Sequence, residues 1–286
     1  MSVVLVTGRN GFVGQELTRR LKETHKVISI IRRQQGGIDY QGEEVILSDL
    51  KEIKAEDIRK FQIDLIVHLA AQLRGRKQDI EENNIRGAQR LFELAETLRV
   101  PVIFLSSTNV LFSDALGSYA RSKRTGEDLL KEKSIPYLIV RVPLVIGWNS
   151  SSMQAIRSFY QKFSFFPLFG RQDGKIQPIA VASIVDVLLS KIDSTISGED
   201  ALNVVGWQSY TYRQIIEKII GGKKKVMFLT IPYQLSLKAV RLFERFRFPF
   251  FISSEEIISV NMNKSIEPKR HGPTIFLDND PELLFT

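Results

Sequence analysis

The chain of 286 residues is long enough to bury a large core and to form one or two domains. Hydrophobic residues make up 43% and charged residues 25%, which is typical of a soluble globular protein, and no apolar run approaches the roughly 20 residues of a membrane span. The absence of cysteine excludes disulfides and thiolate chemistry, and the three histidines are too far apart to predict a metal site. The net charge of +8 is spread over both halves, so it predicts a mildly basic surface and no nucleic-acid partner. Because the chain enters an apolar strand at once, we expect no signal peptide and a cytoplasmic protein.

The most informative segment follows the apolar run at residues 3–6 and reads Thr-Gly-Arg-Asn-Gly-Phe-Val-Gly over residues 7–14. A strand, a glycine turn and a helix in this order predict a dinucleotide-binding loop, because glycines let the backbone approach a pyrophosphate closely. The amino end of the following helix would face that anion with unpaired N–H groups. We expect cofactor contacts along the whole loop, at Gly8, Arg9, Asn10, Gly11, Phe12, Val13 and Gly14.

Strand and helix patterns alternate through the first 147 residues. Apolar strands are expected at residues 3–6, 27–31, 44–47, 65–69, 102–105 and 137–142. Amphipathic helices are expected at residues 14–24, 58–61, 85–98 and 118–132. Continuously apolar strands that alternate with helices predict an α/β fold, a Rossmann-type doubly wound parallel sheet covered on both faces.

The rhythm changes after residue 147, where the chain becomes rich in aromatic residues, serine and glycine. Residues 179–181 and 202–205 predict strands that return to the sheet, and residues 212–220 and 235–246 predict helices. We therefore expect a dinucleotide-binding domain at residues 1–147, with returning segments at about 176–206. Residues 148–175 and 207–286 would form a smaller substrate-binding lobe.

The end of the second strand indicates which dinucleotide binds. An acidic residue there would hold the ribose 2′-hydroxyl of NAD, whereas this chain has Arg32 and Arg33. A guanidinium pairs with a 2′-phosphate, and Arg9 could approach the same phosphate, so the pattern favours NADP(H) while NAD(H) stays possible. The alternative is that Arg32 and Arg33 are simply solvated. Asp49 could accept a hydrogen bond from the adenine amine, or serve as an ordinary helix N-cap.

Tyr119 and Lys123 form the candidate catalytic pair, since a spacing of four residues places them on one face of the helix expected at 118–132. A nearby ammonium would lower the phenol pKa from its usual value of about 10, so that Tyr119 can exchange a proton while hydride moves. Lys123 can also bind the nicotinamide ribose. The fifth strand ends in hydroxyl residues, Ser107 and Thr108 among them, at the sheet edge where such folds place ligands.

Together these motifs resemble the extended short-chain dehydrogenases/reductases of the NAD(P)-dependent epimerase/dehydratase group. The likeness extends from residue 3 to about residue 220, through residues 7–14, 48–50, 68–71, 84–87, 106–110, 119–123 and 141–147. It implies Ser107 as the catalytic hydroxyl, with Thr108 second, and Asn84 as a support for the region between the fourth and fifth strands. It also implies cofactor contacts at Asp49, Leu50, Leu69, Ala70, Ala71, Asn84, Tyr119, Lys123 and Pro143.

Departures from the family pattern narrow the expected reaction. Leu144 stands where an asparagine often touches a sugar diphosphate, and residues 180–183 lack the acidic residues of the later family segment. Residues 107–109 lack the Asp-Glu pair that sugar 4,6-dehydratases use. We therefore expect 4-keto reduction of a nucleotide-linked sugar first and epimerisation second. The alternative is a non-catalytic NADPH-binding accessory or regulatory subunit of the same fold.

The substrate lobe carries an aromatic segment at residues 159–169. Phe169 and its neighbours would form either an apolar wall for the substrate or core packing. Arg157 and Arg171 flank this segment, as candidates for a diphosphate or as a solvated rim. Residues 235–251 mix leucines with cations, which is typical of a buried C-terminal helix face or of a membrane-surface helix. The family resemblance also implies a homodimer that pairs through the helices at 85–98 and 118–132.

Overall fold

The computed structural model describes residues 1–36, 38–73, 75–112, 117–148, 150–170, 173–221, 226–245 and 254–278. Its centre is an eight-stranded sheet in the order β14-β11-β6-β5-β4-β1-β2-β3, with every neighbouring pair parallel. The strands are β1 (Val3–Thr7), β2 (Lys26–Ile31), β3 (Glu43–Leu47), β4 (Leu65–His68), β5 (Val102–Ser107), β6 (Tyr137–Val142), β11 (Glu199–Gly206) and β14 (Thr274–Leu277). The strand order reverses between β1 and β4, and this reversal creates the crevice in which doubly wound folds bind ligands.

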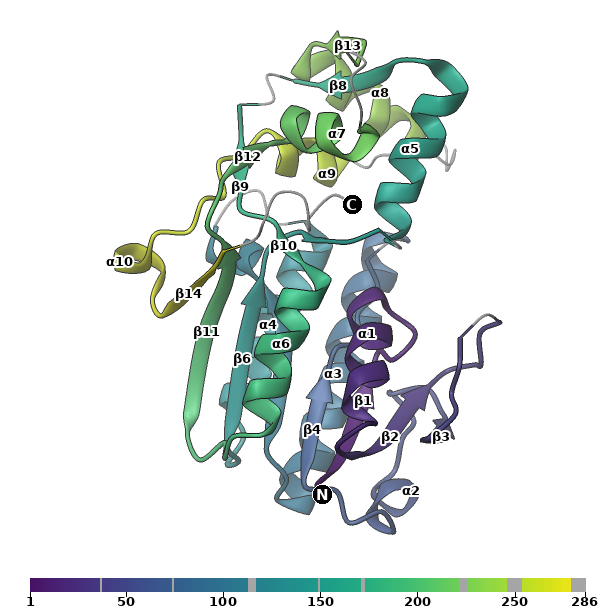
Figure 1. Ribbon diagram of the computed structural model, residues 1–286, viewed down its shortest axis with the longest axis vertical. Helices are drawn as coiled ribbons and strands as arrows, with labels where there is room; N and C mark the ends of the chain where they lie inside the picture. The colour runs from purple at the N-terminus through teal and green to yellow at the C-terminus, as the bar shows by residue number, and fades with distance from the viewer. Residues whose placement is uncertain are drawn as a thin grey trace.

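Helices cover both faces of the sheet (Figure 1). The helices α1 (Phe12–Leu21) and α6 (Val181–Ile192) pack on one face, and α2 (Ala55–Arg59), α3 (Lys77–Leu98) and α4 (Ser118–Lys131) pack on the other. Successive side chains of β1 pack into two hydrophobic cores on opposite faces of the sheet, since Val4 and Val6 face α1 while Leu5 faces α3. The two cores confirm the doubly wound α/β fold.

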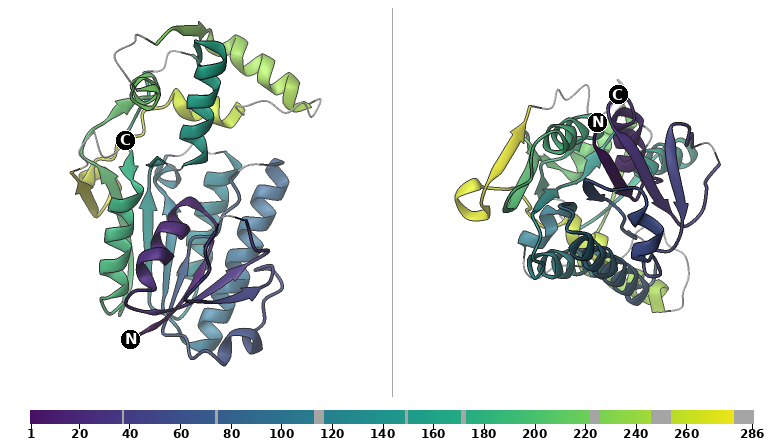
Figure 2. Two further views of the ribbon diagram at one scale, coloured as in Figure 1. Left: turned by 45° about the vertical axis from the view of Figure 1, so that its right-hand side comes forward. Right: turned by 90° about the horizontal axis from the view of Figure 1, so that it is seen from below.

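A smaller lobe sits over the carboxyl ends of the central strands (Figures 1 and 2). Its helices are α5 (Ser151–Phe163), α7 (Tyr212–Ile220), α8 (Tyr233–Arg245) and α9 (Ser254–Val260). Its longer strands, β8 (Phe166–Phe169) and β13 (Phe228–Ile231), pair in parallel. Short pairs complete the connections, namely β7 (Val145–Ile146) with β10 (Ile179–Ala180) and β9 (Lys175–Ile176) with β12 (Tyr210–Thr211), and the remaining elements are the 3-10 turn η1 (Thr108–Leu111) and α10 (Pro268–His271).

The structure differs from the expected domain boundaries in two places. Residues 179–180 form a two-stranded ribbon with β7 and do not join the main sheet, because residue 181 already begins α6. Residues 274–277, which the sequence predicts to be part of the lobe, instead extend the main sheet by pairing with residues 203–206 of β11. The returning part of the dinucleotide-binding domain therefore includes β11, α6 and β14.

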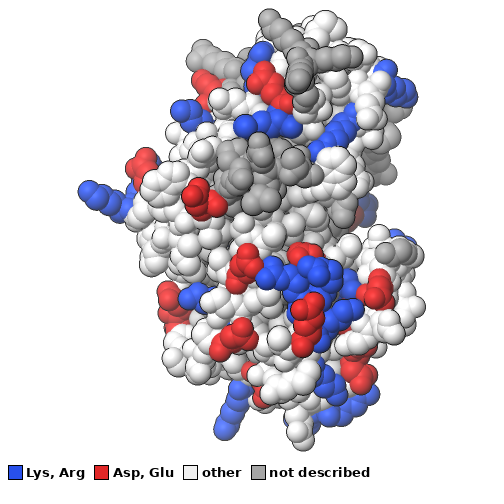
Figure 3. Space-filling model, viewed as in Figure 1, with Lys and Arg blue, Asp and Glu red and all other residues white. Residues whose placement is uncertain are grey.

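The charges on the molecular surface are mixed. On the face shown in Figure 3, basic and acidic side chains alternate, and acidic side chains adjoin the largest basic group in the lower half. Among the helices of the described residues, none combines the length and the apolar character needed to cross a bilayer.

Candidate active site

The glycine loop joins β1 to α1 with very close backbone contacts. Gly8 has a φ of +77°, and a Cβ there would lie 2.5 Å from the amide nitrogen of Ala70. A Cβ at Gly14 would lie 2.2 Å from the carbonyl oxygen of Gly8. Gly11 is the N-cap of α1, and within the described residues no side chain caps this helix and no acidic residue lies in its first turn. An uncapped, positively polarised helix end behind a side-chain-free loop fits the pyrophosphate of a dinucleotide.

The chain segment after β4 lies against this loop. The amide of Leu69 donates to the carbonyl of Thr7 over 3.1 Å, and Ala70 and Ala71 follow, partly exposed, next to Gly8. The Thr7 hydroxyl and Nδ1 of His68 share a hydrogen bond of 2.6 Å. Burial lowers the pKa of His68 well below its usual range, so its imidazole is neutral at physiological pH.

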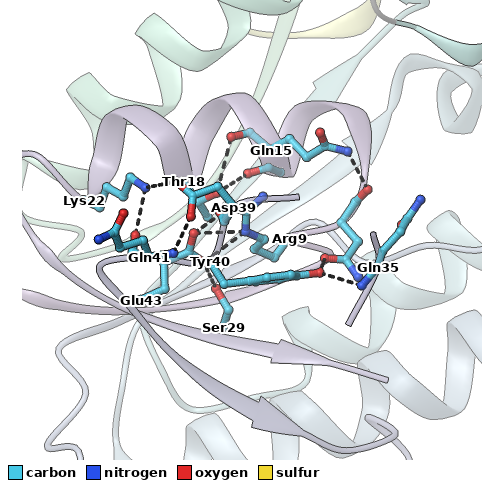
Figure 4. Close-up of polar contacts among 12 residues, drawn as sticks. Arg9, Gln15, Thr18, Lys22, Ser29, Gln35, Asp39, Tyr40, Gln41 and Glu43 are labelled. Carbon is cyan, nitrogen blue, oxygen red and sulfur yellow. Dashed lines mark hydrogen bonds and ion pairs between the residues drawn. The ribbon is translucent and has the colours of Figure 1, made fainter. Parts of the chain in front are cut away.

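Arg9 is bound to an acidic partner from β3 (Figure 4). Its Nε and Nη2 donate to the Glu43 carboxylate over 2.7–3.0 Å, and Nη2 also donates to the carbonyl of Asp39 over 2.5 Å. The Ser29 hydroxyl donates to the same carboxylate over 2.7 Å. The guanidinium lies 5.0 Å from the ring centroid of Tyr40. This network ties the β2–β3 connection to the glycine loop.

The other predicted arginines lie outside this network. The side chains of Arg32 and Arg33 are exposed, and the carbonyl of Arg33 accepts a 3.1 Å bond from Nδ2 of Asn10. The hydroxyl of Tyr40 donates to Oδ1 of Asn10 over 2.8 Å. The expected convergence of Arg9 with the arginines after β2 is therefore not what the structure shows, because Glu43 already holds the Arg9 guanidinium.

Asp49 and Leu50 follow β3. Oδ1 of Asp49 accepts the amide of Lys51 over 3.0 Å in a local turn, while the N-cap of α2 is Lys54, so Asp49 caps no helix. Leu50 packs against Gly87 of α3, where an added Cβ would lie 3.5 Å from the Leu50 side chain. The predicted contact of Asp49 with adenine stays a prediction.

Tyr119 and Lys123 share one face of α4, beside the end of β5. Lys123 is 3% exposed, and its Nζ donates to the carbonyl of Leu105 over 2.7 Å. The same Nζ lies 4.6 Å from the ring centroid of Phe104 and 6.0 Å from that of Tyr119. The Lys123 side chain thus links α4 to β5 through its hydrogen bond to Leu105, and its ammonium group lies near the ring of Tyr119.

The two hydroxyl candidates at the end of β5 are both buried, Ser107 with 6% and Thr108 with 2% exposed surface. The hydroxyl oxygen of Ser107 accepts the amide of Asn109 over 3.2 Å and so caps η1. These residues therefore lie on a fixed turn at the carboxyl edge of the sheet.

Burial determines the protonation of the candidate pair Tyr119 and Lys123. It raises the pKa of Tyr119 to about 12, which contradicts the expectation that a neighbouring ammonium lowers it. Burial also lowers the pKa of Lys123 to about 7, against the opposing effect of Glu127. The phenol is consequently protonated at neutral pH, and the ammonium of Lys123 titrates close to neutrality.

Asn84 connects the segment after β4 to helix α4. Its Oδ1 accepts the amide of Gln72 over 2.6 Å, and its Nδ2 donates to the carbonyl of Gln72 over 3.1 Å and to the Ser122 hydroxyl over 3.0 Å. The Ser122 hydroxyl in turn donates to the carbonyl of Tyr119 over 2.8 Å. Asn84 is thus linked to the backbone that carries the phenol.

The structure adds a buried ion pair, one helix turn after Lys123, which was not predicted from the sequence. Nη2 of Arg141 lies 2.6 Å from Oε2 of Glu127, and the Ser106 hydroxyl donates to Oε1 over 2.6 Å. The Glu127 side chain is 3% exposed and that of Arg141 13%. The sequence does contain a signal, since Tyr119, Lys123 and Glu127 are spaced by four residues along one helix face.

Two of the predicted substrate residues, Phe169 and Arg157, are held within the lobe. Phe169 is 4% exposed and belongs to an apolar cluster with Leu237, Val240 and Ile257, so the structure favours core packing over an open wall at this position. Nε of Arg157 donates to the carbonyl of Ile219 over 2.9 Å, while its guanidinium lies 4.0 Å from the ring centroid of Trp148. Arg171 lies outside the described residues. The remaining predicted cofactor residues are Phe12 and Val13 in α1 and Pro143, partly exposed after β6, and their contacts with a cofactor stay a prediction.

The doubly wound sheet, the glycine loop and the Tyr–Lys helix define an extended short-chain dehydrogenase/reductase. The model of the NAD dependent epimerase/dehydratase family matches residues 4–165, more than half of the chain, and the chain therefore belongs to this family of NAD-dependent enzymes. This confirms the family resemblance and the enzyme class predicted from the sequence. The preference for NADP(H) stays a prediction. Among the described residues, no three His, Asp or Glu side chains lie close enough to hold a metal ion.

Two sequence relatives are reductases. The chain is 24% identical over 245 residues to a ceramide reductase of Caulobacter vibrioides, which covers 83% of this chain and 77% of the relative. It is 26% identical over 231 residues to a UDP-2-acetamido-2,6-beta-L-arabino-hexul-4-ose reductase of Pseudomonas aeruginosa, covering 76% of this chain and 56% of the relative. A solved UDP-glucuronic acid 4-epimerase of Bacillus cereus in complex with NAD is similar in fold, with a TM-score of 0.66, 21% identity and coverage of 90% of this chain and 96% of the other.

Proposed function

We propose that this enzyme is an NADP(H)-dependent reductase of a carbonyl group on a nucleotide-linked sugar, with a 4-keto sugar as the first candidate. The observation that carries the proposal is geometric: Tyr119 and Lys123 share one face of α4, with Nζ of Lys123 6.0 Å from the Tyr119 ring centroid, and this helix packs against β5 and η1, which carry Ser107 and Thr108. Burial also raises the pKa of Tyr119 to about 12. A phenol that keeps its proton at neutral pH suits proton donation to a carbonyl oxygen. Sequence relatives that are named as reductases support the same direction.

The bound nicotinamide would supply the hydride, and the chain supplies the proton and the positioning. The hydroxyl of Tyr119 donates its proton to the carbonyl oxygen as that oxygen gains negative charge. The hydroxyl of Ser107, or that of Thr108, donates a hydrogen bond to the same oxygen and orients it. Lys123, with its pKa of about 7, presents an ammonium that stabilises the phenolate left on Tyr119 until a proton from solvent replaces the one transferred.

The residues support reduction over epimerisation. Leu144, 39% exposed after β6, offers no amide to a sugar diphosphate. The segment that corresponds to the acidic segment of the family lies in β10 and at the start of α6, and it includes Ala180, Val181 and Ala182 instead of acidic residues.

The coenzyme and the assembly form part of the same proposal. Arg32 and Arg33, exposed after β2, supply the cationic groups for a 2′-phosphate. The adjacent helices α3 and α4, which pack side by side on one sheet face, supply the surface for a homodimer. A monomeric mass in light scattering would contradict the dimer.

The test is turnover by Tyr119→Phe. The purified chain is mixed with NADPH or NADH and with UDP- and dTDP-linked 4-keto sugars, and coenzyme oxidation is followed by absorbance. We expect Tyr119→Phe to lose about 10²–10⁴-fold in rate while the NADPH Kd stays within about twofold. Tyr137→Phe is the matched control, because that tyrosine lies at the opposite end of the sheet, where its hydroxyl donates to Glu199 over 3.4 Å.

Each other outcome has a defined meaning. Conversion of a nucleotide sugar without net coenzyme consumption would make the enzyme an epimerase. Coenzyme binding without turnover, and without any effect of Tyr119→Phe, would favour the accessory or regulatory subunit. A keto-lipid in the same panel tests the chemistry named by the ceramide reductase relative, and oxidation of coenzyme with the lipid alone would replace the sugar.

A further inference from the structure

The catalytic helix receives its N-terminal cap from the substrate lobe. Helix α4 begins at Ser118, and its N-cap Gly117 has no side chain with which to accept a hydrogen bond. Glu255 of α9, 137 residues away, accepts the Ser118 amide on Oε2 over 3.0 Å and the Ser118 hydroxyl on Oε1 over 3.0 Å. Ser118 is completely buried beneath this contact. The carboxylate thus accepts one of the amides that the first turn of a helix leaves without an intrahelical partner, as a capping side chain does in other helices.

The surroundings of Glu255 fit that role. A Cβ at Gly117 would lie 2.4 Å from Oε2 of Glu255, so a glycine at this position leaves the space that the carboxylate needs. Nζ of Lys77, the first residue of α3, lies 3.5 Å from Oε1. The carboxylate thus meets the positive end of the α4 dipole and a lysine ammonium, and both attract its negative charge.

Helix α9 is itself fixed to the lobe. Glu244 of α8 accepts the amide of Ser254 over 2.8 Å and its hydroxyl over 2.9 Å, in the same manner as Glu255 binds Ser118. Ile257, completely buried, anchors α9 in the cluster that contains Phe169. These contacts hold α9 within the lobe, so a movement of the lobe would also move the Glu255 carboxylate.

We propose that Glu255 is a positioning residue for Tyr119, which caps the catalytic helix from the substrate lobe and holds the phenol in register with that lobe. The argument depends on the proposed function of Tyr119. Ser118 directly precedes Tyr119, so any shift of the first turn of α4 displaces the phenol. A displacement of about 1 Å at a reacting group costs about 10²-fold in rate.

The first test needs no substrate. Hydrogen exchange of the full chain, followed by mass spectrometry, compares peptides that cover residues 117–125 in the wild type, Glu255→Ala and Glu255→Gln. We expect exchange in the first turn of α4 to rise at least about tenfold in Glu255→Ala and less in Glu255→Gln, whose amide oxygen can still accept the Ser118 amide. Glu81→Gln is the matched control, since it removes a 2.7 Å pair to Arg121 on the surface of the same helix. Unchanged exchange in Glu255→Ala would overturn the cap.

The second test measures turnover with NADPH and the best 4-keto sugar of the panel. We expect kcat of Glu255→Ala to fall roughly 10–100-fold with the coenzyme Kd within about twofold, partial rescue in Glu255→Gln, and no change in Glu81→Gln. Gly117→Ala is a second variant, because its methyl group displaces the carboxylate while Glu255 stays intact. An unchanged kcat in Glu255→Ala, or an equal loss of coenzyme affinity, would overturn the positioning role. If the wild type oxidises no coenzyme, the proposed function fails and the positioning role with it, whereas the exchange result still decides whether the cap exists.

Discussion

The ion pair between Glu127 and Arg141 allows a sharp prediction for Glu127→Gln. The change removes one charge from a pair whose side chains are 3% and 13% exposed and 2.6 Å apart. Breaking a buried pair by neutralising one partner costs about 3–5 kcal/mol, because the remaining charge stays buried without compensation. Since the glutamine oxygen can still accept the Ser106 hydroxyl, we expect about 3 kcal/mol, the lower end of that range.

The neighbouring residue provides the matched control. Asp128 is 62% exposed and lies 3.6 Å from Nζ of Lys131, so Asp128→Asn should change the free energy of unfolding by less than about 0.5 kcal/mol. Urea unfolding at neutral pH measures both variants. The double variant Glu127→Gln/Arg141→Met should recover part of the loss, because it removes the uncompensated guanidinium.

Two results of these unfolding experiments would refute the reasoning about the Glu127–Arg141 pair. Equal destabilisation by Glu127→Gln and Asp128→Asn would show that the pair is not effectively buried. A double variant as unstable as the sum of its single changes would show that the cost arises from lost packing and not from the isolated charge of Arg141. A further consequence concerns Lys123, since Glu127 raises its pKa against burial. The pKa of Lys123 should therefore fall below about 7 in Glu127→Gln, and the pH dependence of turnover should shift to lower pH.

Three further predictions follow from the site. Gly14→Ala should abolish measurable coenzyme binding in calorimetry, because its Cβ would lie 2.2 Å from a backbone oxygen of the loop, whereas Gly198→Ala, with no atom within 4 Å, should bind normally. In the wild type, kcat/KM for reduction should decline as pH rises through about 7, because Lys123 loses its charge there. Lys123→Arg should flatten that decline, because a guanidinium stays protonated. A pH profile with the same midpoint in both proteins would exclude Lys123 as the source of the decline. Replacing Arg32 and Arg33 together by alanine should raise the Kd for NADPH at least about fivefold and leave NADH within about twofold, and equal effects on both coenzymes would contradict a 2′-phosphate site.

The parts of the fold that could be predicted from the sequence depend on residues that are close together along the chain. The parallel strands are buried on both faces and therefore read as unbroken apolar runs, and the glycine spacing marks the turn before α1. The spacing of Tyr119 and Lys123 correctly placed them on one helix face, yet it contained no information on burial, which sets both pKa values.

The parts that could not be predicted depend on contacts across the chain. Glu43 lies 34 residues from Arg9, and nothing in its local sequence shows that it neutralises that arginine. β14 has only four partly buried residues, and so short an apolar run does not show whether it joins the main sheet or the lobe until β11 is seen beside it. Glu255 meets Ser118 only because the lobe folds over the sheet, and the one local sign was a glycine where a capping side chain is usual.

The late arrival of β14 has a consequence for synthesis of the chain. Every other strand of the main sheet has been synthesised once residue 206 is made, yet β14, the second partner of β11, follows only at residues 274–277. During that interval the nascent polypeptide displays the free hydrogen-bonding edge of β11 to any other strand in its vicinity. Chaperone dependence during translation should therefore concentrate in this window, and a premature stop before residue 274 should yield aggregates from an otherwise complete coenzyme domain.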